Sequence, residues 1–216
     1  MIVEKEPKSI AAESYRTLRT NIQYSSFDED YKVIVITSSE PGEGKSTTAG
    51  NLAVSLAQSD KNVILIDCDL RKPSLHKKFN LSNTVGLSDV IVEKESVKNV
   101  GFKYSKNLTV LTSGKIPPNP AEMLGSKSMG ALIEALKKVF DYVILDTPPV
   151  QAVTDAQILS TKADGTIFVV RAEQTKKDSV HNSISLLKKV NANIIGTVLN
   201  GLEASTNNYY YYYGDK

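Results

Sequence analysis

The sequence has few of the residues that hold secreted or metal-binding domains together. Its 216 residues include one cysteine, Cys68, and two histidines, His76 and His181. A lone cysteine cannot form a disulfide within the chain. His181 has no cysteine or second histidine at metal-binding spacing, and His76 lies among lysines, as surface residues do. Residues 1–5 lack the apolar core of a signal peptide. These absences favour the reducing cytoplasm.

Long apolar runs and an excess of one charge are also missing. No apolar run approaches the roughly 18 to 20 residues that span a bilayer, so membrane association would have to come through a partner. The 26 basic residues nearly balance the 24 acidic ones. The sequence therefore argues against nucleic acid as a partner. With 41% hydrophobic residues the chain can bury one core, and we expect a single domain over residues 1–203 and a flexible tail over 204–216.

A glycine-rich loop organises the rest of the chain. Ser39-Glu40-Pro41-Gly42-Glu43-Gly44-Lys45-Ser46-Thr47 follows the apolar run 33–36 and precedes the helical pattern 49–57. Such a loop turns backbone N–H groups around an anion, and the helix dipole adds positive charge at the same place. The sequence predicts a phosphate-binding loop of the Walker A type, although Ser39 stands where that pattern has its first glycine.

Six consecutive residues of this loop are expected to bind a nucleotide: Gly42, Glu43, Gly44, Lys45, Ser46 and Thr47. Lys45 would neutralise the β- and γ-phosphates, and the Ser46 hydroxyl would ligate Mg²⁺. The two glycines allow backbone conformations that a Cβ would obstruct.

Two later apolar strands end in aspartates. The run 62–66 leads into Asp67-Cys68-Asp69-Leu70-Arg71, and the run 142–145 leads into Asp146. Unbroken apolar character indicates strands buried on both faces of a parallel sheet, whose carboxyl ends line the ligand crevice. Asp146 has the form of a Walker B aspartate that holds Mg²⁺ directly or through water. Asp67 and Asp69 are expected to face the same phosphates; the alternative is a pair of loop carboxylates or a helix cap.

Strands and helices alternate along the whole domain. We expect helices at 9–24, 126–139, 154–162 and 176–190, and strands at 33–36, 62–67, 108–112, 142–146, 165–170 and 194–199. This order predicts an α/β fold with a doubly wound, mainly parallel sheet. The proline-rich passage 113–120 is expected to be an irregular loop. Asn200 ends the last strand, where it could hydrogen-bond a nucleotide base or start a turn.

The two ends of the chain carry patterns that a buried core does not explain. Glu13, Arg16 and Arg19 follow one another at intervals of three in the N-terminal helix, which indicates either a solvated salt-bridging face or an interface. Tyr209, Tyr210, Tyr211, Tyr212 and Tyr213 form an unbroken run close to the C-terminus. No strand partner or helical period is available there to bury them.

Taken together, these residues resemble the bacterial tyrosine kinases, or BY-kinases, that govern capsule and exopolysaccharide synthesis. The resemblance covers nearly the whole chain, and its motifs lie at residues 13–19, 41–46, 66–71, 117–122 and 144–149 and in the tyrosine tail. It implies a P-loop kinase fold with Walker A, A′ and B motifs that uses ATP and Mg²⁺. It also implies that the tail is autophosphorylated and that the helix around Glu13 joins subunits into a ring.

The strand-end acids, the loop lysine and the loop serine are expected to have separate roles, because a phenol with a pKa of about 10 needs a base near the attacking oxygen and Mg²⁺ needs oxygen ligands. Lys45, Asp67 and Asp69 would be catalytic, with Asp67 accepting the tyrosine proton, although the two acids could exchange roles. Ser46, Asp69 and Asp146 would hold the metal. The expected partners are a membrane-anchored activator, which would recruit the kinase to the inner face of the cell membrane, and a phosphotyrosine phosphatase.

Two other functions fit the same fold. The septum-positioning and plasmid-partition ATPases use ATP to switch dimerisation, but they have a lysine early in the loop where this chain has Glu40. A nucleotide-dependent scaffold that phosphorylates nothing is the third possibility.

Overall fold

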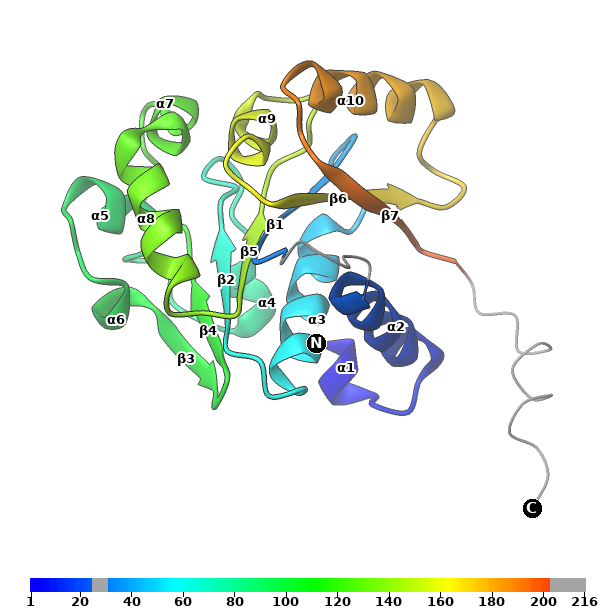
Figure 1. The fold of residues 1–216 in the computed structure, drawn as a ribbon, viewed down its shortest axis with the longest axis horizontal. Coiled ribbons are helices and arrows are strands. Elements are labelled where there is room, and N and C mark those ends of the chain that lie inside the picture. The colour runs from blue at the N-terminus through cyan, green and yellow to red at the C-terminus, as the bar shows by residue number, and fades with distance from the viewer. Residues whose placement is uncertain (25–30, 203–216) are drawn as a thin grey trace.

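One sheet forms the centre of the protein, and helices cover both of its faces (Figure 1). The computed structural model describes residues 1–24 and 31–202. Within these ranges seven strands pair in the order β3-β4-β2-β5-β1-β6-β7. Their bounds are β1 Val33–Ser38, β2 Val63–Asp67, β3 Phe102–Ser105, β4 Leu108–Leu111, β5 Tyr142–Asp146, β6 Gly165–Arg171 and β7 Ile194–Asn200.

Every strand pair is parallel except β3 with β4. The doubly wound, mainly parallel sheet expected from the sequence is thus confirmed. Strand β5 lies between β1 and β2, and its register places Asp146 opposite both Ile36 and Asp67. The carboxyl ends of these three strands therefore meet at one edge of the sheet, which is where ligands bind in such folds.

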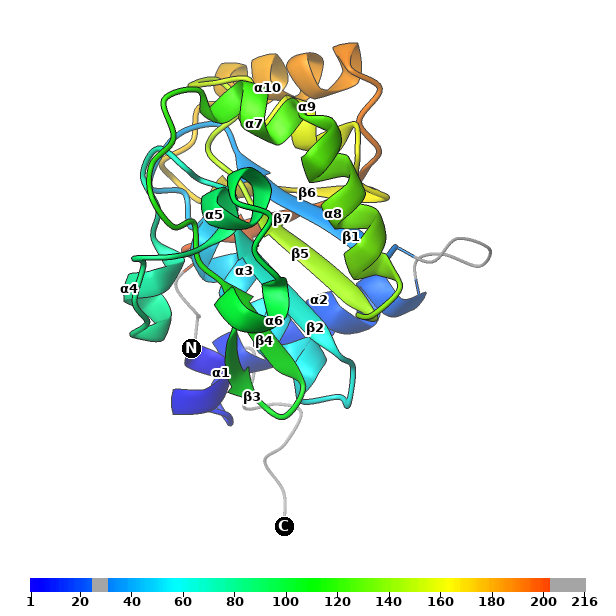
Figure 2. The ribbon, with the colours of Figure 1, turned by 90° about the vertical axis from the view of Figure 1, so that its left-hand side faces the viewer.

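The side chains of each strand alternate between two hydrophobic clusters. Ile34 and Ile36 pack toward α3, whereas Val33 and Val35 pack toward α8. The first face is covered by α1 (Ile2–Lys5), α2 (Ile10–Tyr24), α3 (Lys45–Ala57) and α4 (Leu75–Phe79). The second face is covered by α5 (Leu87–Val92), α6 (Val97–Val100), α7 (Pro120–Gly125), α8 (Lys127–Lys137), α9 (Asp155–Ser160) and α10 (Lys177–Lys189). Figure 2 shows α5 and α8 in front of the strands and α3 behind them.

A serine hydroxyl caps the start of two expected helices. The Ser9 hydroxyl accepts a hydrogen bond from the Ala12 N–H at 3.2 Å, one residue before α2 begins. The Ser126 hydroxyl does the same for the Met129 N–H at 3.1 Å before α8. Side chains of α2 at helical spacing, those of Tyr15, Leu18 and Ile22, pack on the core next to α3.

Several short elements depart from the sequence-based prediction, among them α1, α6, α7 and β3. Helix α7 begins at Pro120, inside the passage expected to be irregular, because proline is tolerated in a first helical turn. Strand β3 and helix α6 were not expected either. In β3 only alternate residues are half-buried and the others are exposed. The strand therefore has no run of apolar residues from which it could be predicted. The tail 204–216, with Tyr209 to Tyr213, lies outside the described residues, so its expected flexibility stays a prediction.

No helix within residues 1–24 and 31–202 is long and apolar enough to cross a membrane.

Candidate nucleotide-binding site

The loop between β1 and α3 has the backbone of an anion-binding turn. Gly42 and Gly44 have φ values of 85° and 98°, in the left-handed region that favours glycine. Gly44 is the N-cap of α3, and its carbonyl accepts the Thr48 N–H at 2.8 Å. The N–H groups of the first helical turn, at residues 45–47, have no intrahelical acceptor in an α-helix. They and the helix dipole favour an anion at this point, as the sequence predicts.

Lys45 and Asp69 approach each other beside this loop. Lys45 Nζ lies 3.5 Å from Asp69 Oδ2, and both side chains are largely buried. The Lys72 N–H donates to the other oxygen, Asp69 Oδ1, at 2.9 Å. The structure therefore brings the lysine of the phosphate loop, Lys45, next to Asp69. This contact holds the Lys45 side chain beside the loop.

Asp146 is fully buried at the end of β5. Among the described residues, neither of its carboxylate oxygens accepts a hydrogen bond of ordinary geometry. Burial raises the pKa of this carboxyl to about 6, against the lowering effect of Lys45 and the Ser46 hydroxyl. A fully buried carboxylate with no hydrogen bond of ordinary geometry is unfavourable, and a bound cation would reduce that cost.

The residues around Asp146 fit Mg²⁺. Ser46 Oγ and the carboxylates of Asp69 and Asp146 supply the hard oxygen ligands that this ion prefers. No group of three or more His, Cys, Asp or Glu able to hold a metal occurs in the part of the chain that the structure describes. Mg²⁺ that arrives with a nucleotide does not need such a cage, because it keeps waters and phosphate oxygens as ligands.

Asp67 is more enclosed than the sequence suggests. Its Oδ2 accepts the N–H groups of Ser74 and Leu75, each at 2.9 Å, and its Oδ1 accepts the Asp69 N–H at 3.2 Å. The side chain is fully buried. Burial and the nearby Asp146 raise its pKa to about 8. Asp67 thus anchors the start of α4, in addition to any part in the chemistry.

A set of contacts fastens the phosphate loop to β6, β7 and α10. The Glu43 carboxylate accepts the Thr175 hydroxyl, and the Glu40 carboxylate accepts the Ser179 hydroxyl at 2.7 Å. Arg171 donates to the Gly42 carbonyl at 3.0 Å. The second carboxylate oxygen of Glu43 accepts the Glu40 N–H at 3.1 Å, so both oxygens are engaged within the protein and the Glu43 backbone N–H is the group left for a nucleotide.

Asn200, at the end of β7, is one of the residues that hold the phosphate loop against the neighbouring elements. Its side-chain amide donates to the Glu43 carbonyl at 2.9 Å. A Cβ added to Gly44 would lie 1.9 Å from the Asn200 Nδ2. Asn200 lies at the ligand edge, as expected, but in this structure its amide N–H supports the loop.

Sequence reasoning missed two charged residues near the site. Lys78 of α4 donates to the Thr47 hydroxyl at 2.9 Å. Arg71 makes a bidentate ion pair with the fully buried Asp155 of α9. Its Nε donates to Asp155 Oδ2 at 3.0 Å and its Nη2 donates to Oδ1 at 3.1 Å. Lys78 lies between the apolar residues of a short helix, and that spacing is the one signal that could have placed it on the α3 side.

The expected interface residues of α2 have different surroundings. Glu13 and Arg16 form an ion pair at 2.7 Å, with Glu13 half-exposed. The Arg16 guanidinium also donates to the Pro7 carbonyl. Arg19 turns inward and donates to the Ser55 carbonyl at 3.0 Å. The structure therefore leaves Glu13 and Arg16 at the surface and ties Arg19 to α3.

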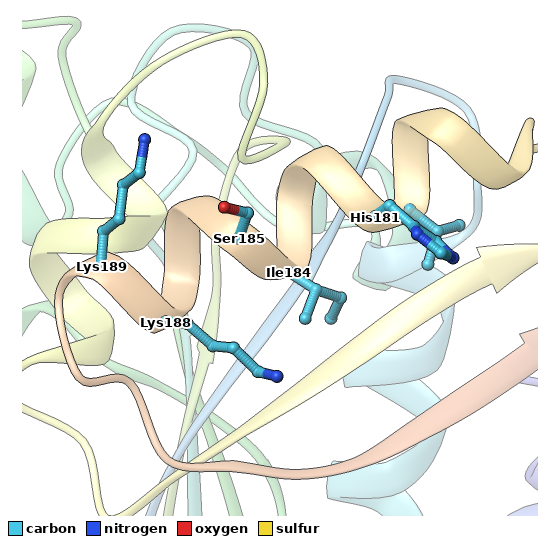
Figure 3. Close-up of a pocket in the computed structure, with 6 residues that line it drawn as sticks. His181, Ile184, Ser185, Lys188 and Lys189 are labelled. Carbon is cyan, nitrogen blue, oxygen red and sulfur yellow. The ribbon is translucent and has the colours of Figure 1, made fainter.

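A hollow of about 690 Å³ lies along α10, away from the loop (Figure 3). Its lining comes from α10 alone and includes none of the expected site residues. Ile184 and Lys188 point toward the strands, and Lys189 points to the opposite side of the helix. The candidate site is therefore defined by the loop and the strand-end acids.

A glycine-rich loop leading into a helix, together with acids at the ends of the neighbouring parallel strands, defines a P-loop protein that binds a nucleotide. The ParA family model, described as the NUBPL iron-transfer P-loop NTPase, matches residues 30–209.

Comparison with known proteins shows which group of P-loop proteins the chain resembles. The chain is 48% identical over 217 residues to the tyrosine-protein kinase YwqD of Bacillus subtilis strain 168, covering 100% of this chain and 92% of that protein. It is 37% identical over 220 residues to the putative tyrosine-protein kinase CapB of Staphylococcus aureus, covering 100% and 95%. The kinase domain of the Escherichia coli tyrosine kinase ETK superposes with a TM-score of 0.89 at 34% identity, covering 93% of this chain and 79% of that one.

The chain belongs to the bacterial tyrosine-protein kinases, a group with the ParA-type P-loop fold. The family and the enzyme class expected from the sequence are thereby confirmed.

Proposed function

We propose that this kinase transfers the γ-phosphoryl group of ATP to the tyrosines at 209–213, and that transfer runs from one subunit to the tail of another. The observation that carries the proposal is the convergence of Lys45, Asp69 and Asp146 on the start of α3. The position of β7 supports it, because β7 ends at Asn200, which contacts the phosphate loop. The tyrosine run thus follows closely after the ligand edge of the sheet.

In the proposed reaction a phenol oxygen attacks the γ-phosphorus of ATP. The new bond joins that oxygen to phosphorus, the bond to the bridging oxygen of ADP breaks, and the phenol proton passes to a carboxylate. Lys45 and the N–H groups of residues 42–47 hold the phosphates in line and neutralise charge. Mg²⁺, held by Ser46, Asp69 and Asp146, would add charge neutralisation when bound.

The proton acceptor in this proposal is Asp67. A phenol with a pKa of about 10 needs a base near the attacking oxygen. Asp67 lies opposite Asp146 across the β2–β5 pair, at the edge where the phosphates bind. Asp69 is engaged by Lys45, which favours an orienting role for it.

The short stretch of sequence between Asn200 and the tyrosines supports transfer between subunits. A tyrosine tethered by a short segment to the edge of its own site cannot easily bring its hydroxyl in line with the γ-phosphate, whereas a neighbouring site can lie within its span. A ring joined through the surface around Glu13 and Arg16 would supply that neighbour. Phosphorylation adds about −1.5 to −2 charges per tyrosine, so a phosphorylated tail would be repelled and the assembly would open.

The proposed setting is the inner face of the cell membrane. A membrane-anchored protein would recruit and activate the kinase there, and a phosphotyrosine phosphatase would reset it. The cycle would regulate the synthesis and export of capsular or exopolysaccharide. The resemblance to the BY-kinases supports this part of the proposal.

The decisive test is to mix two variants and follow labelled phosphate from ATP. One is Lys45→Met with an intact tail, and the other has an intact site but ends at residue 203. Neither variant alone should form phosphotyrosine in a tail. The first lacks the phosphate-binding lysine, with an expected loss of at least about 100-fold, and the second lacks the tail itself. In the mixture, phosphotyrosine should appear on the intact tails.

The outcomes separate the alternatives. Unlabelled tails in the mixture, with labelled wild-type protein, would exclude transfer between subunits. Undiminished labelling of Lys45→Met alone would exclude this site altogether. ATP hydrolysis by the wild type without phosphotyrosine would favour an ATPase switch, and nucleotide binding without either reaction would favour a scaffold.

A further inference from the structure

Helix α4 is short, but both of its ends are fixed. At its start, Asp67 accepts the N–H groups of Ser74 and Leu75. Leu75 is fully buried and Phe79 nearly so, and both belong to the cluster formed with α3. The Phe79 ring also meets the Tyr104 ring edge to face, with centroids 4.8 Å apart. These contacts hold α4 in one orientation against α3.

That orientation decides where the lysines of α4 point. Lys78 lies three residues after Leu75 and one before Phe79, so it lies on the helix side that faces α3. Its Nζ donates to Thr47 Oγ1 at 2.9 Å. Lys77 is exposed and is rotated by about 100° around the helix from Lys78. Two adjacent lysines thus have different surroundings.

The partner of Lys78 belongs to the phosphate site. Thr47 is the third residue of α3, within the turn whose N–H groups have no intrahelical acceptor. Two ammonium groups from different elements therefore converge on the start of α3: Lys45, held by Asp69, and Lys78, held by Thr47.

We infer that Lys78 is a second phosphate-binding lysine, which exchanges the Thr47 hydroxyl for a phosphate oxygen when a nucleotide is bound. A phosphate oxygen carries negative charge and the Thr47 hydroxyl does not, so the exchange adds the attraction between opposite charges to the hydrogen bond and is favourable. The inference rests on the nucleotide site of the proposed function, and it adds a residue from outside the Walker motifs. Lys78 contributes affinity that ADP and ATP share.

The competing explanation is a solvated lysine that touches Thr47 without taking part in binding. Lys78 is exposed, and an isolated surface contact of this kind contributes little to stability. This explanation predicts the same nucleotide affinity with and without the ammonium group. The two explanations therefore differ in a binding constant, which can be measured without any phosphoryl transfer.

The experiment is a calorimetric titration of the full chain with ADP and Mg²⁺ at one fixed salt concentration. The variants are Lys78→Met, Lys78→Arg and the matched control Lys77→Met, which loses the same charge from the adjacent position. Lys78→Met should weaken ADP binding about tenfold, the size of one lost hydrogen bond to a charged group. Lys77→Met should stay within about twofold of wild type, and Lys78→Arg should recover part of the loss because it keeps the charge.

Thermal unfolding without nucleotide checks the fold, and we expect the same midpoint for all four proteins. Equal ADP affinity of wild type and Lys78→Met would overturn the inference and leave the rest of the site intact. An equal loss in Lys77→Met would also overturn it, since net charge would then be the cause. Failure of the wild type itself to bind ADP would instead remove the nucleotide site of the proposed function.

Discussion

At the scale of single residues, Asp67 has two roles that can be separated. It caps the start of α4 with one carboxylate oxygen, and in the proposed reaction it receives the tyrosine proton. An amide in its place can still accept the N–H groups of Ser74 and Leu75 through its oxygen, but it is not a base.

Asp67→Asn should therefore reduce phosphotyrosine formation by at least about 100-fold, the usual contribution of a general base. ADP affinity should change by less than about threefold, because α4 stays in place. Asp67→Ala should lose both properties, since it also frees the start of α4. Rates of labelling and ADP titrations on the two variants measure the difference. Full activity in Asp67→Asn would show that another group, with Asp69 the next candidate, takes the proton.

The sequence predicted the residues of the site that lie within motifs, and missed those that depend on folding. Lys45, Asp69 and Asp146 converge because a P-loop and parallel strand ends meet at one sheet edge. Lys78 and Thr47 are 31 positions apart, and Thr175 and Glu43 are 132 apart. No local pattern reports such pairs, because tertiary packing alone decides which polar side chains meet.

At the scale of elements, the segment after β2 is tied to α9. Arg71 follows the acids of this segment, and its guanidinium pairs with both oxygens of the buried Asp155. The hydrogen bond to Asp155 raises the Arg71 pKa further, so the arginine stays charged at every accessible pH. The pair fixes the path of the chain between Asp69 and α4.

Arg71→Met would leave the Asp155 carboxylate buried without its cation. We expect a loss of about 1 to 3 kcal/mol in the free energy of unfolding, less than for a fully enclosed pair because the Arg71 side chain is 40% exposed. Denaturant titration measures it. The neighbouring Lys72→Met, which removes one charge from the same segment, should change stability by less than about 0.5 kcal/mol. Equal stability of Arg71→Met and wild type would contradict the role given to the pair.

Elements with a clear period were predicted, and those without one were not. The helix at Ile10–Tyr24 and the buried strands have apolar residues at the spacing that their burial requires. Strand β3 and helix α6 have four residues each, too few for any period to appear. At Pro120 the sequence was misread, because the proline that ends one structure can also begin the first turn of a helix.

At the scale of the whole molecule, α2 presents one side to the core and another to the surface. The Glu13–Arg16 pair lies on the surface side, whereas the Arg19 guanidinium is bonded to α3. A ring that forms through α2 would therefore use Glu13 and Arg16 directly, and it would depend on Arg19 through the placement of the helix.

We expect Arg16→Ala to lower the mass measured by light scattering from that of a ring toward that of a single chain, with an unfolding midpoint close to that of the parent. Arg19→Ala should lower the midpoint as well, because it leaves the Ser55 carbonyl without its donor. Thr17→Ala, an exposed position on the same helix, is the control and should assemble as the parent does. An Arg16→Ala protein as large as the parent would exclude this surface as the ring contact.

The bonds that join the phosphate loop to β6, β7 and α10 have a consequence for how the protein responds to its ligand. Because Glu40, Glu43 and Asn200 already hold the loop in shape, the entropy of ordering it is lost during folding and not at the moment of binding. A rigid loop gives affinity, but it has the same shape whichever nucleotide it holds. In the proposed function, the difference between ATP and ADP would therefore have to be sensed at the third phosphate, by side chains such as Lys45 and Asp69 and not by the loop backbone.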